Sequence, residues 1–198
     1  MIQSFVTRLF EYRHFWRYAS FAEIAELYAS RTLRIVGMNI ASGFASVYLY
    51  QAGYSLVFIM TFWLIFFAAK VGLSFLAGKI TALQGPKRGV FFSNLLYIPA
   101  MTMLGFVPLL GVQAIIVWGA LMALSECLYQ ISYYVDFSKV RNPDHSGKEL
   151  GFMNVLEKVA IGMSPIVGGV IALLFGAQIL MWVAAGIFLV AAIPLFLS

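Results

Sequence analysis

The sequence predicts an all-α integral membrane protein of six transmembrane helices, and three observations lead to this fold class. The chain is apolar, with 11% charged residues and a mean hydropathy of +0.91, whereas charged residues make up about a quarter of a soluble domain. The charged residues fall only within segments 8–34, 70–88 and 126–158. The charge-free stretches are 35–69, 89–125 and 159–198. Each is about twice the ~20 residues that a helix needs to cross a bilayer, so each predicts a hairpin of two helices.

The basic residues predict the orientation in the membrane. All thirteen Lys and Arg residues lie in the three charged segments, which by the positive-inside rule face the cytoplasm together with both termini. We therefore expect a plasma (inner) membrane protein. The net charge of +5 then reflects topology and gives no reason to expect nucleic-acid binding.

Residues 1–20 predict a cytoplasmic amphipathic segment that precedes the membrane domain. Aromatic and aliphatic side chains alternate with Arg8, Arg13 and Arg17, which is typical of an interfacial helix on an anionic leaflet. A flexible basic leader that only fixes the topology is the alternative. Ser20 and Glu23 have the spacing of a capping box, so a new helix is expected to begin at residue 21.

The transmembrane domain is expected to span 21–198, and turn signals separate its helices. YQAGY at 50–54 marks the first outer turn, and Gly-Pro at 85–86 breaks the chain after the second helix. Gly111 and Gly176 mark the second and third outer turns. The expected helices span residues 21–49, 55–78, 89–109, 112–137, 150–175 and 178–197.

An internal repeat divides these six helices into three plus three. Five residues near the end of the second helix recur at one constant offset in the fifth helix. They are Gly72, Ser74, Gly78, Ala82 and Leu83, which match Gly162, Ser164, Gly168, Ala172 and Leu173. Because each half has an odd number of crossings, the two halves would be inverted repeats. Coincidence is the alternative, since glycine and serine are common in membrane helices.

Two motifs resemble those of the major facilitator superfamily (MFS) of secondary transporters. The cytoplasmic loop expected at 79–88 is similar, with the glycine before it, to that family's loop signature, through Gly78, Gly85, Lys87 and Arg88. The fifth helix carries a small-residue pattern similar to one found in many antiporters of the family: Ala160, Ser164, Pro165, Gly168 and Gly169. The resemblance covers essentially the whole chain. It implies the amino-terminal six-helix half bundle of a carrier with 3+3 inverted repeats.

The chain also departs from the family pattern. Ala82 and Leu83 stand where the loop signature usually has an acidic and a basic residue, which puts the family's cytoplasmic latch in doubt. Family members usually have twelve helices in two halves, whereas six are predicted here. The resemblance therefore implies a pathway built with a partner bundle, either a second copy in a homodimer or a second six-helix half.

Lys70 and Glu126 are the two charges predicted to penetrate deepest into the membrane. Counted from the helix ends at ~1.5 Å per residue, both lie at similar depth, so they can face each other between the second and fourth helices. Ionisable groups at depth mark ion or substrate pathways. One hypothesis is that this pair exchanges its proton or partner during transport. The alternative is a static ion pair, or a Lys70 side chain that reaches towards the cytoplasm.

Polar residues on the first and fourth helices are candidate solute contacts. Asn39 lies on one face of the first helix, and Glu126, Gln130 and Tyr133 share a face of the fourth. In the family these helices line the central cavity, so we expect the solute here. Helix–helix packing is the alternative. Arg31 and Arg34 can attract an anionic solute, although topology anchoring is the simpler interpretation.

The sequence favours a transport function over an enzymatic one. It contains no nucleophile elbow, zinc-protease motif or phosphate-binding loop, so no catalytic residue, metal or cofactor is predicted. We expect a half-length MFS-type carrier, in contact with the lipid bilayer, that moves a small solute by alternating access. The sequence leaves coupling to protons or sodium as an open alternative to uncoupled transport. The alternative is a non-transporting six-helix module or scaffold that binds a partner chain.

Overall fold

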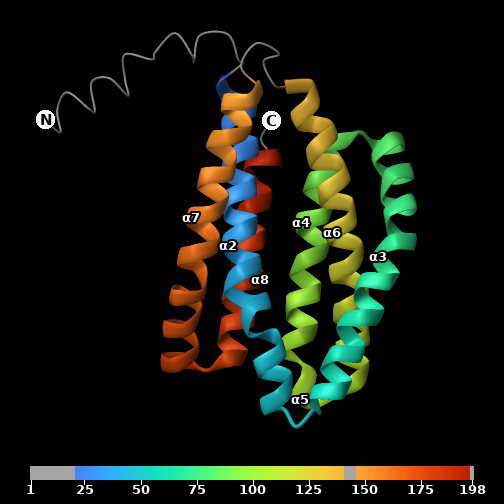
Figure 1. Ribbon diagram of the computed structural model, residues 1–198, viewed down its shortest axis with the longest axis vertical. Helices are drawn as coiled ribbons and strands as arrows, with labels where there is room; N and C mark the ends of the chain where they lie inside the picture. The colour runs from blue at the N-terminus through green and yellow to red at the C-terminus, as the bar shows by residue number, and fades with distance from the viewer. Residues whose placement is uncertain (1–20, 141–145, 197–198) are drawn as a thin grey trace, which may run out of the picture.

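The regular structure of the chain is helical. The computed structural model describes residues 21–140 and 146–196, and every regular element within these ranges is an α-helix (Figure 1). The elements are α2 (Phe21–Gln51), α3 (Leu56–Gln84), α4 (Pro86–Gly105), α5 (Val107–Leu110), α6 (Val112–Val140), α7 (Ser146–Phe175) and α8 (Ala177–Phe196). The all-α prediction is confirmed for this part of the chain. The amphipathic segment predicted at 1–20 lies outside the described residues.

Three of the described helices are long and apolar enough to cross a membrane. They are Leu56–Gln84, Val112–Lys139 and Leu150–Phe175, and the apolar helix Ala177–Ala191 is shorter. The helices α2 and α4 contain more polar residues, which lowers their hydropathy. These spans are compatible with a membrane protein.

The predicted outer turns coincide with the observed helix ends. The first falls between α2 and α3, where the Ser55 side chain caps α3 by accepting a hydrogen bond from the Phe58 amide at 3.2 Å. Gly176 alone separates α7 from α8, and its φ of +89° explains why glycine stands at this turn. Local turn chemistry therefore sets the lengths of these hairpins.

The loop predicted at 79–88 is replaced by an almost direct helix-to-helix turn. α3 continues to Gln84 because residues 79–84 contain good helix formers and no helix breaker. Gly85, with φ +88°, is the one residue between α3 and α4. Pro86 is well suited to the first position of α4, where no backbone N–H is needed. The observed turn is thus much tighter than the predicted one.

The long helices pack as two groups of three (Figure 1). One group contains α2, α7 and α8, and the other contains α3, α4 and α6. Contacts between α4 and α8 join the groups, and Tyr97 stacks on Phe188 there with ring centroids 4.0 Å apart. Both aromatic side chains are fully buried. The centre of the bundle is therefore closed by aromatic packing between α4 and α8.

The helix contacts repeat when the first three long helices are exchanged with the last three. The extensive contact of α4 with α6 corresponds to that of α8 with α2. The contact of α3 with α6 corresponds to that of α7 with α2, and α3–α4 corresponds to α7–α8. The outermost helices, α3 and α7, thus occupy equivalent places in the two groups.

Gly168 lets α7 approach α2 closely. A Cβ atom at this position would lie 2.9 Å from the Ile40 carbonyl oxygen and 3.0 Å from the Phe44 ring. Ser164, one turn earlier, is buried as well, whereas Gly162 faces open space. The small-residue pattern of α7 therefore includes one position, Gly168, at which the absence of a side chain permits close helix packing.

We expect Gly168→Ala to be about 2 kcal/mol less stable than Gly162→Ala, because overpacking against a backbone atom cannot be relieved by a rotamer change. Gly162→Ala is the matched control: it adds the same methyl group to α7 without a contact and gains helix propensity. Thermal unfolding in mild detergent measures the difference. Equal stability of the two variants would contradict the close α2–α7 contact.

Candidate functional site

A polar cavity of about 250 Å³ lies between α2, α6 and α7. Four of the side chains around it are charged, which is unusual for an apolar helical bundle. It is lined by Arg31, Arg34, Ile35, Met38, Asn39, Glu126, Tyr129, Gln130, Tyr134, Glu157 and Ile161. The cavity is therefore the strongest candidate for a functional site.

Arg31 and Glu157 form an ion pair that links α2 to α7. Arg31 Nη2 donates to Glu157 Oε2 at 2.6 Å, and both side chains are mostly buried. The Arg31 guanidinium also lies over the Tyr133 ring, with its central carbon 4.4 Å from the ring centroid. The positive charge of Arg31 is thus balanced by a carboxylate and an aromatic face.

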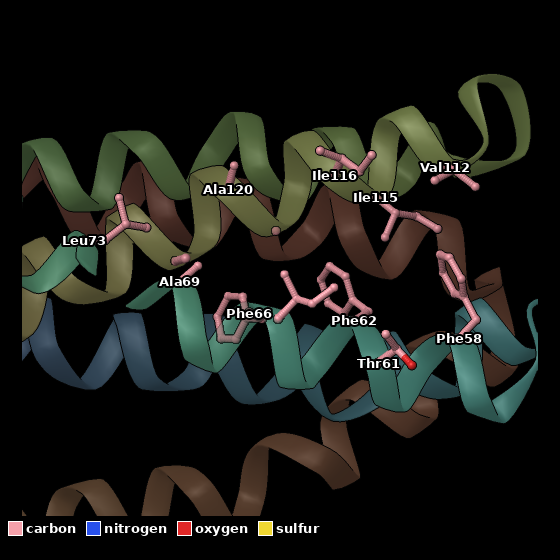
Figure 2. A pocket seen from close by; sticks show the side chains of 13 residues that line it. Phe58, Thr61, Phe62, Phe66, Ala69, Leu73, Val112, Ile115, Ile116 and Ala120 are labelled. Atoms are coloured by element: carbon pink, nitrogen blue, oxygen red, sulfur yellow. The ribbon is translucent and has the colours of Figure 1, made fainter. Parts of the chain in front are cut away.

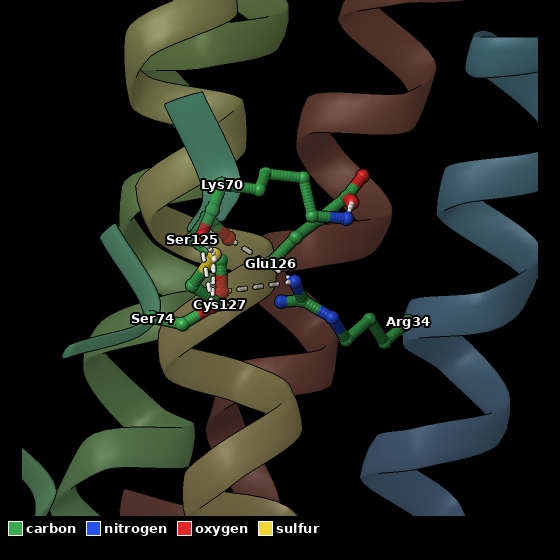
Figure 3. Close-up of polar contacts among 6 residues, drawn as sticks. All are labelled: Arg34, Lys70, Ser74, Ser125, Glu126 and Cys127. Atoms are coloured by element: carbon green, nitrogen blue, oxygen red, sulfur yellow. Dashed lines mark hydrogen bonds and ion pairs between the residues drawn. The ribbon is translucent and has the colours of Figure 1, made fainter. Parts of the chain in front are cut away.

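Lys70 and Glu126 form the ion pair that the sequence predicts between the second and fourth helices (Figure 3). Lys70 Nζ donates to Glu126 Oε2 at 2.6 Å, and the two side chains are 20% and 14% exposed. Near the pair, the Lys70 carbonyl accepts hydrogen bonds from Ser74 Oγ at 2.7 Å and Cys127 Sγ at 3.5 Å. The pair therefore joins α3 to α6 beside the cavity.

Arg34 is buried and points from α2 into the interior, towards α6 (Figure 3). Its Nη1 donates to Asn94 Oδ1 at 2.7 Å, and its Nη2 donates to Ser125 Oγ at 3.1 Å. The Tyr129 ring covers the guanidinium, with its centroid 4.0 Å from the central carbon. All of these partners are neutral.

The partners of Arg34 continue into a buried polar network. Asn94 Nδ2 donates to Ser30 Oγ at 3.2 Å, and Ser30 Oγ donates to the Ala191 carbonyl at 2.9 Å. Ser125 Oγ donates to the Ser93 carbonyl at 2.7 Å. This network connects α2, α4, α6 and α8, so the position of Arg34 is fixed by four helices.

The structure brings most of the predicted solute contacts together. Glu126, Asn39 and Gln130 line the cavity, and Lys70 binds Glu126 beside it. The Asn39 amide nitrogen donates to the Ile35 carbonyl of its own helix at 2.8 Å, which leaves its oxygen as an acceptor. Tyr133 is not among the lining residues: it is fully buried and its hydroxyl donates to the Met153 sulfur of α7.

Sequence reasoning missed the central position of Arg34. Topology anchoring was the simpler interpretation, but only 1% of this residue is exposed. One feature of the sequence could have indicated this position. Arg34 is the last residue of the charged segment 8–34, just as Lys70 and Glu126 are the first residues of theirs. Tyr129, Asn94 and Glu157 were not singled out, because nothing in their spacing marks them as neighbours of Arg34.

The two family-like motifs lie outside the cavity. Gly78 and Gly85 belong to the end of α3 and its turn, Arg88 is exposed and Lys87 is half-buried. None of these residues lines the cavity. In α7 the small-residue pattern provides packing through Ala160, Ser164 and Gly168, whereas Pro165 is exposed and Gly169 is half-buried.

A second, apolar pocket of about 500 Å³ lies between α3 and α6 (Figure 2). It is lined by Phe58, Thr61, Phe62, Ile65, Phe66, Ala69, Leu73, Val112, Ile115, Ile116, Gly119, Ala120 and Ala123. Thr61 is the one hydroxyl in this lining, and its Oγ1 already donates to the Val57 carbonyl at 2.8 Å. The pocket therefore lacks free polar groups that would orient a solute.

Comparisons with models of protein families, with curated proteins and with solved structures gave no match. Within the described residues, no group of three or more His, Cys, Asp or Glu side chains is placed to hold a metal ion.

Proposed function

We propose that this chain is a six-helix half of an MFS-like secondary carrier, in which the cavity between α2, α6 and α7 binds a small solute. The observation that carries the proposal is the cluster of charged and amide side chains at this cavity in an otherwise apolar bundle. Such groups are costly in a membrane and normally mark a transport pathway.

The repeated helix contacts support an inverted-repeat carrier. Under exchange of the first and last three long helices, α2 corresponds to α6, and these two helices provide most of the cavity lining. Inverted-repeat transporters place their binding sites at the interface of the repeats, near the middle of the membrane. We propose six crossings with both termini in the cytoplasm, as the basic residues predict.

A second bundle would complete the pathway. Exposed polar side chains such as Gln130 and Tyr134 flank the cavity, and a carrier needs a facing bundle against which this one can rock. A second copy of the chain or another six-helix half would fill this role. The Lys70–Glu126 pair is then the candidate for coupling to protons or sodium, because separation of the pair would free a carboxylate that can take up a proton or a sodium ion beside the site.

Water access to the cavity tests the proposal. In a Cys127→Ala background, which removes the native thiol, we expect Gln130→Cys in proteoliposomes to react with a charged thiol reagent. The reaction should be at least about tenfold faster than for Val159→Cys, because the reactive thiolate forms only where water reaches the sulfur. Val159 of α7 is the matched control, since more than half of it is exposed but it does not line the cavity.

Equal, slow modification of both cysteines would mean that lipid or a partner protein covers the cavity face. That result would contradict the carrier and favour the scaffold that the sequence leaves as the alternative. Fast modification of both cysteines would also contradict the carrier, because water would then reach α7 outside the cavity as well.

A further inference from the structure

We infer that the cavity binds the anionic group of its solute, a carboxylate or phosphate, and that Arg34 is the charge partner of this group. The inference rests on the proposed function and names its substrate class. It comes from the charges around the cavity, which do not balance among the side chains that the structure describes. Arg34 is the cation that has no carboxylate within ion-pair distance among the described side chains.

Three cations and two carboxylates meet at this site. Arg31 is paired with Glu157, and Lys70 is paired with Glu126, both at 2.6 Å. No carboxylate of the described residues lies within ion-pair distance of Arg34. The site therefore carries one net positive charge, and its source is the deepest and least exposed of the cations lining the cavity.

The neutral partners of Arg34 do not use its full donor capacity. A guanidinium has five N–H donors, and here Asn94 and Ser125 accept from the two terminal nitrogens. The Nε atom is buried without an acceptor, and so is the Nε atom of Arg31. Two donors without acceptors beside an excess positive charge favour an anionic ligand, because hydrogen bonds between charged groups are stronger than those between neutral groups.

The rest of the cavity suits the remainder of a small polar solute. Asn39 offers its amide oxygen, and Gln130 and Tyr134 add groups that both donate and accept. A volume of about 250 Å³ is that of roughly eight water molecules. A small carboxylic acid or phosphate ester fits these limits, and an anionic lipid headgroup has the same oxyanion chemistry.

The full chain in mild detergent provides the test, with inorganic phosphate and succinate as soluble probes at constant ionic strength. We expect at least one of them to bind saturably in a radioligand assay. Arg34→Gln should weaken this binding at least tenfold, whereas Arg88→Gln should leave it unchanged. Arg88 is the matched control, because the substitution removes the same charge from an exposed residue outside the cavity.

A second measurement uses the wild-type chain, because Arg34 also joins four helices and Arg34→Gln can fail to fold. Phenylglyoxal modifies arginine side chains, and mass spectrometry locates the product. Because only 1% of Arg34 is exposed, the reagent reaches it only when the cavity opens. An anion bound in that cavity should slow modification of Arg34 without slowing that of Arg88. A purely structural role for Arg34 predicts no such protection.

Nanodiscs with and without phosphatidylglycerol distinguish a soluble anion from a lipid headgroup. Protection of Arg34 by phosphatidylglycerol alone would keep the oxyanion site and assign it to lipid. Absence of protection by phosphate, succinate and phosphatidylglycerol would overturn the inference, as would equal loss of binding in Arg34→Gln and Arg88→Gln. If Gln130→Cys nevertheless reacts fast, the carrier proposal stands and only the anionic substrate class fails.

Discussion

Glu126→Ala is expected to destabilise the protein by about 3 kcal/mol, because it leaves the Lys70 ammonium partly buried without its counter-ion. Lys70 lies on α3, whose main neighbour is α6, and its pairing with Glu126 adds the one ion pair to that contact among the described residues. The nearby Phe66 ring, with its centroid 5.5 Å from Nζ, compensates only a small part of this charge. Chemical unfolding in mixed detergent micelles measures the loss.

A double-mutant cycle separates the pair from its surroundings. Lys70→Met alone should cost less than Glu126→Ala, because Glu126 shares its cavity with Arg34. The double variant should recover much of the stability lost in Glu126→Ala. Replacing both members of a buried pair by apolar residues is often neutral, whereas removing one is not. Additive losses would show that the two side chains contribute independently, which would contradict the ion pair.

The sequence predicted the helices well because two independent signals coincide at their ends. Charged segments limit where a membrane helix can lie, and turn residues such as Gly176 then fix its end within one or two residues. Other bounds differ from the prediction. α3 continues to Gln84 instead of ending at 78, and α7 begins at Ser146 instead of 150. α4 spans Pro86–Gly105 instead of 89–109, and the short helix α5, which was not predicted, follows it. The charged residues at 79–88 indicate contact with water, but they do not require a loop, because a helix can continue from the membrane into water.

The sequence predicted a contact in the site correctly only where it follows from the positions of two residues along their helices. Lys70 and Glu126 were predicted to lie at similar depth on neighbouring helices, and the structure pairs them. Rotation about a helix axis is harder to predict, because a hydrophobic membrane helix has no polar face that fixes it. Tyr133 and Gln130 are three residues apart on α6, yet Gln130 lines the cavity and Tyr133 packs against α7.

The same uncertainty explains why Arg34 was not recognised. An arginine at the start of a membrane helix either faces the headgroups or turns inward, and the positive-inside rule accommodates both. The residues that decide the outcome are Asn94, Ser125 and Tyr129, which come from α4 and α6. These residues contact Arg34 only when the helices are packed, so the sequence around Arg34 does not predict the contacts.

Gly89→Ala is expected to be about 3 kcal/mol less stable than Gly78→Ala, because α4 and α6 have no room for a side chain at residue 89. An added Cβ would lie 2.0 Å from Ser132 Oγ and 2.8 Å from Ser132 Cβ, whereas one at Gly78 meets nothing. Rotation of the Ser132 hydroxyl away from the clash would break its 2.7 Å hydrogen bond with Thr81 and leave the Cβ contact unrelieved. Thermal unfolding in mild detergent measures both variants.

Ser132→Gly supplies the control for this mechanism, because it removes both atoms that the new methyl group would meet. In the wild-type background it should destabilise the protein, since it deletes the buried hydrogen bond with Thr81 and lowers helix propensity. In the Gly89→Ala background the same substitution should be stabilising, because relief of the overlap outweighs both losses. Destabilisation of equal size in the two backgrounds would show that residue 89 does not pack against Ser132, and the contact between α4 and α6 would then have to be looser than the structure has it.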